Sequence, residues 1–176
     1  MTFREATPKD SAAIALLHAR SWQVHYRGIL SEAYLAHEVT DDRLKIWESR
    51  LAHPAPNQYV RVAEDGGTLC GLACVYAGED PVWGSLLDNL HVLPGYQGRG
   101  VGTRLLAEAA RWAAQRAPGL PFYLLVYAQN EQARRFYESL GGTREETFLV
   151  DNPGGGRSPA CRYVWRDLSP EGGIGF

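Results

Sequence analysis

The chain has 176 residues, of which 45% are hydrophobic and 22% are charged, and its formal net charge is −2. This length suits a single domain that buries about 70% of the surface of its unfolded chain. The near-neutral charge gives no electrostatic case for nucleic acid or an anionic membrane surface, so neither partner is expected.

The sequence also bears on location and on metal binding. No stretch approaches the ~20 consecutive apolar residues of a spanning helix, and charged residues such as Arg4 and Lys9 interrupt the N-terminal region, so we expect a cytoplasmic protein. Cys70 and Cys74 lie in one predicted strand, about 13 Å apart at strand rise and too far for a disulfide. We expect three buried thiols, and no metal site because the five histidines share no ligand spacing with the cysteines.

The first half of the chain is predicted to start with a short strand followed by helices. Residues 2–7 form the strand, and the helix-entry sequence that follows begins a helix running to about Tyr26. After Gly28, Ser31 caps a short helical turn, and residues 40–42 cap another helix that stops before Pro54.

From residue 58 to 78 the hydrophobic pattern changes to that of strands. The Asp-Gly-Gly sequence at 65–67 predicts a tight turn, so the two flanking runs form a hairpin. A loop at 78–84 then leads into the central strand.

Residues 86–106 are the segment around which the rest of the chain is organised. An apolar run is broken by a Pro-Gly pair, crosses three alternating glycines (98, 100 and 102) and opens into a helical pattern over about 100–116. Glycines let a backbone approach a ligand closely, and a helix start carries the positive end of the helix dipole. This strand, turn and helix therefore suit a phosphate group.

Two better-known phosphate loops do not fit this segment. The P-loop requires a lysine, and the only lysines of the chain are Lys9 and Lys45. The dinucleotide fingerprint requires a third glycine where Thr103 stands and an acidic residue closing the next strand, where 124–128 offers none.

The remaining elements complete a mixed α/β sheet with helices on both faces. Residues 122–127 form a nearly continuous apolar strand, Asn130 caps a helix that ends at two glycines, and two strands follow at about 143–150 and 160–167. We expect one domain over 1–168 and a loosely held tail over 169–176.

Two stretches resemble the motifs of the GCN5-related N-acetyltransferase (GNAT) family. Gln97, Gly100 and Gly102 match the motif Gln/Arg-x-x-Gly-x-Gly/Ala, and residues 126–141 match Val-x3-Asn-x2-Ala-x2-Phe-Tyr-x3-Gly. Gly142 departs from the family, which usually has phenylalanine there, and we expect a small packing change without loss of function. The resemblance implies an α/β (α+β) fold with a mixed, mostly antiparallel, splayed central sheet of about seven strands and helices on both faces.

The resemblance further implies acetyl-CoA as cofactor. Its pantetheine arm would pair with the backbone of the splayed central strand, and its pyrophosphate would bind the amides of the glycine-rich turn. Asn130 would hydrogen-bond the arm, although a plain helix cap explains it equally well. The implied cofactor residues are Leu90, Val92, Gln97, Gly98, Arg99, Gly100, Val101, Gly102, Thr103, Asn130 and Tyr137.

Acyl transfer to an amine requires a neutral amine, a stabilised oxyanion and a protonated leaving thiolate. Asp88 is the first candidate base because it matches the glutamate of polyamine acetyltransferases and has the strand parity of Leu86 and Val92; many relatives place their glutamate at the position of Leu86. His91, of opposite parity, is the second candidate. A main-chain N–H near Val92 would meet the oxyanion. Tyr137 matches the tyrosine that protonates the thiolate, with a purely structural role as the alternative.

The acceptor pocket is expected to involve the first half of the chain. A Trp-x3-Tyr-x-Gly pattern at 22–28 resembles that of a subgroup of acetyltransferases, and aromatic faces there could meet a cationic amine. Trp22 and Tyr26, four residues apart on one helix, could equally be core residues. The candidate acceptor residues are Trp22, His25, Tyr26, Tyr34 and Trp83.

Together these expectations describe an N-acetyltransferase that moves an acetyl group from acetyl-CoA to a primary amine of a small molecule, by direct attack in a ternary complex. One alternative is a protein or peptide N-acyltransferase, or an enzyme that uses a longer acyl-CoA. Another is a catalytically inactive CoA-binding regulatory module. Relatives often dimerise through strands near the C-terminus, so a homodimer remains open.

Overall fold

A computed structural model describes residues 1–168 and Ile174, so most of the expected tail lies outside the described residues. The helices and strands follow the predicted order. They are β1 (Thr2–Glu5), α1 (Ser11–His25), α2 (Glu32–His37), α3 (Val39–Ala52), β2 (Gln58–Asp65), β3 (Thr68–Asp80), β4 (Gly84–Val92), α4 (Val101–Arg116), β5 (Phe122–Tyr127), α5 (Glu131–Ser139), β6 (Thr143–Asp151) and β7 (Arg157–Trp165).

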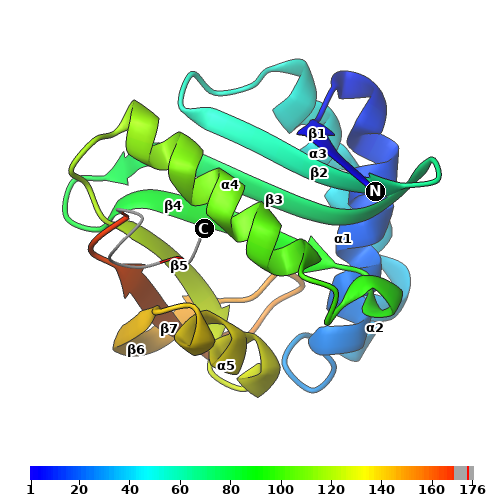
Figure 1. Ribbon diagram of the computed structural model, residues 1–176. Coiled ribbons are helices and arrows are strands. Elements are labelled where there is room, and N and C mark those ends of the chain that lie inside the picture. Colours follow the sequence, from blue (N-terminus) through cyan, green and yellow to red (C-terminus); the bar gives the residue numbers. More distant parts are fainter. Residues whose placement is uncertain (169–173, 175–176) are drawn as a thin grey trace.

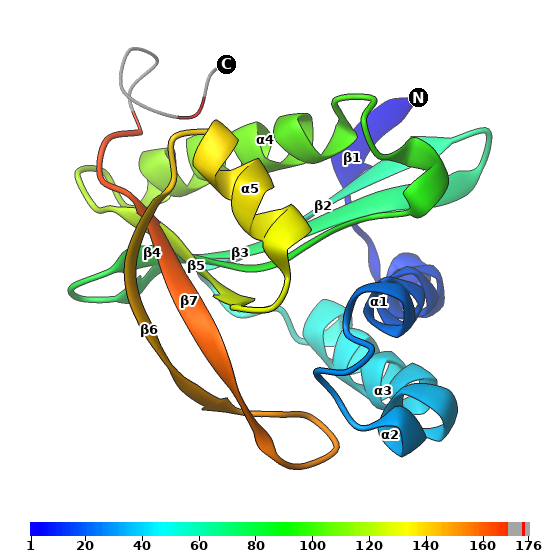
Figure 2. The ribbon, with the colours of Figure 1, turned by 90° about the horizontal axis from the view of Figure 1, so that it is seen from below.

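The described strands form one seven-stranded sheet in the order β1-β2-β3-β4-β5-β7-β6. Every neighbouring pair is antiparallel except β4 and β5, which run parallel. Helices α4 and α5 cover one face of the sheet, and α1, α2 and α3 lie on the other (Figures 1 and 2). The mixed, mostly antiparallel sheet with helices on both faces is confirmed.

The helices are held by apolar stripes on their inner faces. Along α4, Val101, Leu105 and Leu106 are almost fully buried against the sheet, in one core cluster that also includes Ile174. On the opposite face, Ile14 of α1 and Trp47 of α3 are fully buried against β2 and β3. Full burial of one such side chain contributes roughly 1.5–3 kcal/mol, so these two clusters fix where each helix lies.

Strands β4 and β5 pair over a very short length. The register includes only Ser85 opposite Phe122 and Leu86 opposite Tyr123. Beyond these pairs β4 continues along β3 as far as Val92, and β5 continues along β7 as far as Tyr127. The two strands therefore diverge, and the splayed central sheet is confirmed.

Strand β4 contains a β-bulge at Asp88. Val75 of β3 lies opposite Leu87, whereas its neighbour Cys74 lies opposite Asn89, so Asp88 is one extra residue on β4. Such an insertion interrupts the alternation of side chains between the two faces. The expectation that Asp88 shares the parity of Val92 and opposes that of His91 is therefore wrong. Asp88 and His91 contact α3 and α1 on one face of the sheet, and Val92 packs against α4 on the other.

The space at Gly142 is filled by Trp165. A Cβ atom at Gly142 would lie 2.7 Å from Trp165 Cζ2, closer than real Cβ contacts allow. The indole is fixed there because its Nε1 donates a hydrogen bond to the carbonyl of Leu140 at 2.8 Å. Trp165 thus supplies the bulk that the family usually has at this glycine.

Two further predictions can be compared with the structure. The hairpin at 65–67 joins β2 to β3 as expected, with Gly66 and Gly67 at φ +57° and +82°. All three cysteines are buried and free, as predicted. Within residues 1–168, no helix is both long and apolar enough to cross a membrane.

Candidate functional site

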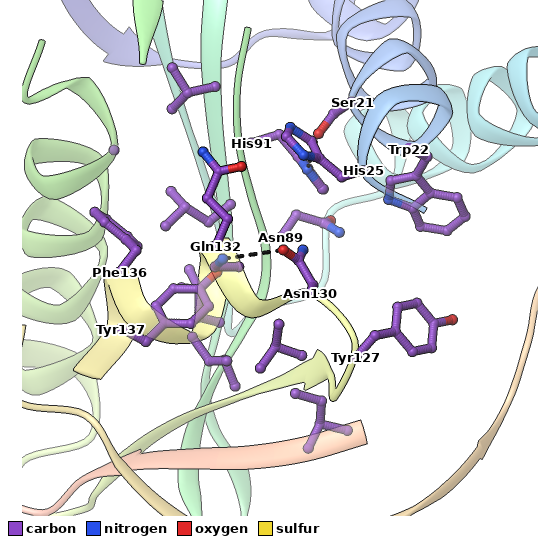
Figure 3. A pocket seen from close by; sticks show the side chains of 18 of the residues that line it. Ser21, Trp22, His25, Asn89, His91, Tyr127, Asn130, Gln132, Phe136 and Tyr137 are labelled. Carbon is purple, nitrogen blue, oxygen red and sulfur yellow. Dashed lines mark hydrogen bonds between the residues drawn. The ribbon is translucent and has the colours of Figure 1, made fainter. Parts of the chain in front are cut away.

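A cavity of about 600 Å³ opens where β4 and β5 diverge. Its walls come from the C-terminal end of α1, from β4 and β5, from the glycine-rich turn before α4 and from the start of α5, and β6 and β7 each contribute one residue. Figure 3 shows these side chains around the opening. Segments distant in the sequence thus meet at the point where the sheet splits.

Main-chain groups border this gap on both sides, and of these the carbonyls of Val92 and Tyr127 accept hydrogen bonds from Gln97 Nε2 at 3.0 Å and from Asn130 N at 2.9 Å. Leu93 N donates to Cys70 O at 2.9 Å, and since peptide groups alternate in direction along a strand, those of Leu90 and Val92 point away from β3, toward β5. On the other side Ala128 N donates to Pro159 O at 2.8 Å, so the peptide groups of Leu125 and Tyr127 point toward β4. An extended chain could therefore pair with either edge, in the manner of an added strand.

The glycine-rich turn presents backbone amides to the same cavity. Gly98 and Gly100 adopt φ +69° and +78°, a region that favours glycine, and a Cβ atom on either would meet nothing within 4 Å. No side chain caps α4, whose first turn leaves three N–H groups, those of Val101, Gly102 and Thr103, without helical partners. Free amides at the positive end of a 16-residue helix form a fitting cradle for a diphosphate.

The two arginines near this turn do not line the cavity. Arg99 lies over the ring of Tyr96, at 5.2 Å from its centroid. Arg104 packs over Phe3 and donates to Glu108 at 2.9 Å. Arg99, one of the expected cofactor residues, therefore lies outside the lining, to which the turn contributes Gly98 and Gly100.

The start of α5 closes the far side of the gap. Asn130 Oδ1 accepts a hydrogen bond from Ala133 N at 3.2 Å, which makes Asn130 the helix cap that the sequence predicts, and its side chain also lines the cavity. Gln132 Nε2 donates to Gln97 Oε1 at 3.4 Å, and Gln97 Nε2 donates to the carbonyl of Val92 at 3.0 Å. These two glutamines link the edge of β4 with α5.

Tyr137 reaches the cavity from α5. It is 8% exposed and packs beside Phe136, with ring centroids 5.4 Å apart (Figure 3). Burial raises the pKa of the Tyr137 phenol well above its ordinary value, so the hydroxyl stays protonated through the neutral range. A protonated phenol in this position can donate a hydrogen bond or a proton to a group in the cavity.

Asp88 lines the cavity from β4 and is ion-paired. Arg50 Nη1 of α3 lies 2.7 Å from Asp88 Oδ2 and 3.0 Å from Asn89 Oδ1. The bulge turns Asp88 toward α3 and so makes this contact feasible. Asp88 is therefore a carboxylate paired with an arginine at the edge of the cavity.

His91 lines the cavity and is held by α1. Its Nδ1 lies 2.9 Å from Ser21 Oγ, and its ring lies against that of His18, with centroids 4.4 Å apart. Burial, together with the neighbouring His25, lowers the pKa of His91 to about 3. His91 is therefore neutral near pH 7 and a weak proton acceptor.

His18 lies behind His91 and is fully buried. Trp47 Nε1 donates to His18 Nδ1 at 3.0 Å, which leaves the proton of the neutral ring on Nε2, and that atom has no hydrogen-bond partner. Burial lowers the pKa of His18 well below its ordinary value, with a smaller contribution from His91.

Three of the five predicted acceptor residues line the cavity, namely Trp22, His25 and Tyr26. Tyr34 lies outside the lining and donates a hydrogen bond to Asp42. Trp83 lies outside it too, at the opposite end of β4, beneath the guanidinium of Arg162 at 4.4 Å. The aromatic wall is completed by Tyr127, which sequence reasoning missed; its place at the end of β5, just before the motif residue Asn130, was the available signal.

These features can be compared with known proteins. The acetyltransferase (GNAT) family matches residues 19–142, more than half of the chain, and the protein belongs to that family. It is 40% identical over 95 residues to the N-alpha-acetyltransferase RimI of Mycobacterium tuberculosis, across 53% of this chain and 56% of that protein. The chain thus matches only about half the length of this curated relative.

Solved structures share the fold over almost the whole chain. A GCN5-related N-acetyltransferase from Rhodopseudomonas palustris has a TM-score of 0.73 at 21% identity, with 93% of both chains covered. The PaiA N-acetyltransferase of Thermoplasma acidophilum in complex with coenzyme A has a TM-score of 0.68 at 21% identity, covering 92% of this chain and 96% of that one. At identities this low, the similarity to these structures shows a shared fold and nothing more.

Proposed function

We propose that this protein is an acetyl-CoA-dependent N-acetyltransferase that acetylates the primary amine of a small molecule by direct attack in a ternary complex. The observation that supports this most strongly is the divergence of β4 from β5 beyond Leu86, with the peptide groups of Leu90 and Leu125 facing the gap from its two edges and the glycine-rich turn at its end. An extended arm ending in a diphosphate matches both features at once.

The cofactor would be held chiefly by main-chain groups. The main-chain groups of Leu90 and Leu125 would pair with the amides of the pantetheine arm, and the turn at 98–103 would bind the pyrophosphate. Acetyl-CoA supplies an acetyl thioester whose sulfur is a good leaving group. The side chains of Asn130 and Gln97 border the same channel and would orient the arm.

The reaction forms a bond between the amine nitrogen and the acetyl carbon and breaks the bond from that carbon to sulfur. Asp88, the carboxylate of the cavity lining, would take the amine proton directly or through water. His91 would be the second candidate base, and burial lowers its pKa to about 3. The N–H of Val92 would stabilise the oxyanion, and Tyr137 would protonate the thiolate.

One observation favours a second candidate, a peptide N-terminus as acceptor. The relative that is 40% identical over about half its length is named for N-alpha acetylation. The two candidates differ in what extends beyond the amine, because a peptide must continue out of the cavity as a chain.

The proposed function is tested by release of the CoA thiol from acetyl-CoA in the presence of an amine library and a set of short peptides. Turnover with small amines supports the proposal, and turnover with peptides alone supports the second candidate. Binding of coenzyme A without turnover of any acceptor would identify a regulatory CoA-binding module instead.

A further inference from the structure

Resting on the proposed function, we infer that the acceptor is a primary amine on an uncharged aromatic or branched apolar body, rather than a polyamine or an amino acid. The inference comes from the chemistry of the cavity wall beyond the reacting centre. That wall is formed by Trp22, Tyr26, Leu125, Tyr127, Val150 and Ala160.

The aromatic members of this wall are arranged to contact a flat apolar group. The rings of Tyr26 and Tyr127 are perpendicular with centroids 5.0 Å apart, and the ring of Trp22 lies 5.5 Å from that of Tyr26. Figure 3 shows Trp22 and Tyr127 at the cavity. Aromatic rings prefer such tilted and edge-to-face contacts, so a further ring of a ligand would find the same kind of contact here. Leu125 adds an apolar side chain that is 43% exposed and so available to a ligand.

The wall offers no free charge to a second polar group of the acceptor. Within the described part of the chain, Asp88 is the one Asp, Glu, Lys or Arg among the lining residues, and Arg50 already pairs with it at 2.7 Å. Burial lowers the pKa of His25, and of His91 still further, so both contribute neutral rings near pH 7. A second ammonium, or a carboxylate, would be desolvated there without a counter-charge.

The indole of Trp22 is also unsuited to a cation. The guanidinium of Arg43 already lies over this ring, 4.4 Å from its centroid. A ligand ammonium approaching the same aromatic system would meet a like charge behind it. Trp22 is therefore an apolar part of the wall. The sequence suggested instead that its aromatic face could meet a cationic amine.

A contact between two loops limits the length of the acceptor at this end. Asn152, which follows β6, donates to the carbonyl of Ile29 at 3.3 Å, and a Cβ atom on Gly154 would lie 2.5 Å from the ring of Tyr34. The hairpin that carries Val150 and Ala160 is thus fastened to the segment that follows α1. The body of the acceptor must fit between these walls.

The test compares two pairs of amines that differ by one charge. Phenethylamine and phenylalanine differ by a carboxylate, and butylamine and putrescine differ by a second ammonium. We expect kcat/KM to be at least about tenfold higher for the first member of each pair, because an unpaired buried charge is costly. A preference for putrescine or equal use of phenylalanine overturns the inference.

A wall variant sharpens the test. Leu125→Asp places a carboxylate in the lining and should raise the rate ratio of putrescine to butylamine about tenfold, whereas Leu149→Asp, an exposed leucine outside the lining, should leave it unchanged. An unchanged ratio in Leu125→Asp contradicts the inference. Calorimetry with coenzyme A distinguishes a failure of this inference from a failure of the proposed function. If coenzyme A binds but none of the four amines is acetylated, the acceptor class is refuted. If the wild-type protein does not bind coenzyme A, the proposed function is refuted.

Discussion

Asp88 and Arg50 are ion-paired, with Asp88 Oδ2 2.7 Å from Arg50 Nη1, although 38 positions separate them in the sequence. The side chains of both residues remain more than a quarter exposed, so the pair contributes at most about 1 kcal/mol to stability. The pairing places the only charged side chain among the described lining residues at the edge of the cavity. We therefore expect the Asp88–Arg50 pair to affect the rate of turnover more than the stability of the fold.

Asp88→Asn should lower kcat about 100-fold or more at neutral pH, because the amide cannot take the proton of the amine. The affinity for coenzyme A should stay within about twofold, since the cradle lies elsewhere on the chain. Steady-state kinetics and calorimetry measure the two quantities. Arg50→Gln is the companion variant: if it lowers kcat as much as Asp88→Asn does, the pair positions the acceptor and Asp88 is not the base.

Tyr137→Phe should lower kcat about 100-fold with little change in coenzyme A affinity or stability, because it removes one hydroxyl and keeps the ring. The raised pKa of Tyr137 means that the wild-type enzyme retains its proton donor across the neutral range. Tyr59→Phe is the matched control, since Tyr59 stacks on Trp112 at 4.9 Å away from the cavity. Equal turnover in wild type and Tyr137→Phe would remove the tyrosine from the mechanism.

Gly100→Ala should weaken coenzyme A binding at least tenfold, which corresponds to about 1.4 kcal/mol of binding free energy. A methyl group there occupies the open space in front of the amides and strains a backbone at φ +78°. Gly119, in the turn after α4, has the same φ and equally open space around its Cα, so Gly119→Ala is the matched control. It should lower the free energy of unfolding by a similar amount, roughly 1–2 kcal/mol, without affecting coenzyme A binding. Equal affinities in the two variants would place the diphosphate elsewhere.

The buried histidines predict how stability depends on pH. His18 and His91 have lowered pKa values in the folded state, so below about pH 6.5 the unfolded chain binds protons that the folded one does not. Stability is therefore full above that pH and falls by about 1 kcal/mol per histidine between pH 6.5 and 5.5.

Urea denaturation at the two pH values measures this loss. His18→Gln keeps an acceptor for the Trp47 N–H, and it should reduce the difference between the two free energies by about half. His53→Gln, at an exposed histidine, should not. If His18→Gln lost as much stability between the two pH values as the wild type does, the lowered pKa of His18 in the folded state would be contradicted.

Much of the fold could be predicted because its signals are local. The Asp-Gly-Gly turn and the apolar stripe of α4 lie within a few residues of the elements that they define. The cradle was predictable for the same reason, since Gly98 and Gly100 take positive φ values that glycine alone adopts easily. The cap at Asn130 also depends only on its neighbours.

The remainder of the site depends on contacts between distant segments. The bulge at Asp88 is set by the pairing of β4 with β3, so strand parity wrongly placed Asp88 on the same face as Val92 and opposite His91. The partners Ser21 of His91 and Trp47 of His18 come from other elements, and no spacing in the sequence indicates them. Trp83 lies outside the cavity because it precedes β4, whereas β4 borders the cavity only beyond Leu86, and the point of divergence from β5 depends on strand pairing.

The central claim is that the diverging strands and the glycine turn hold coenzyme A through their backbone amides. The most direct measurement is an amide NMR titration of the isotopically labelled protein with coenzyme A. The account predicts saturable shifts concentrated at the amides of Val92, Leu125 and residues 98–103, with the amides of β1 and β2 unchanged. Shifts that leave Val92 and residues 98–103 unmoved at saturating coenzyme A would contradict it.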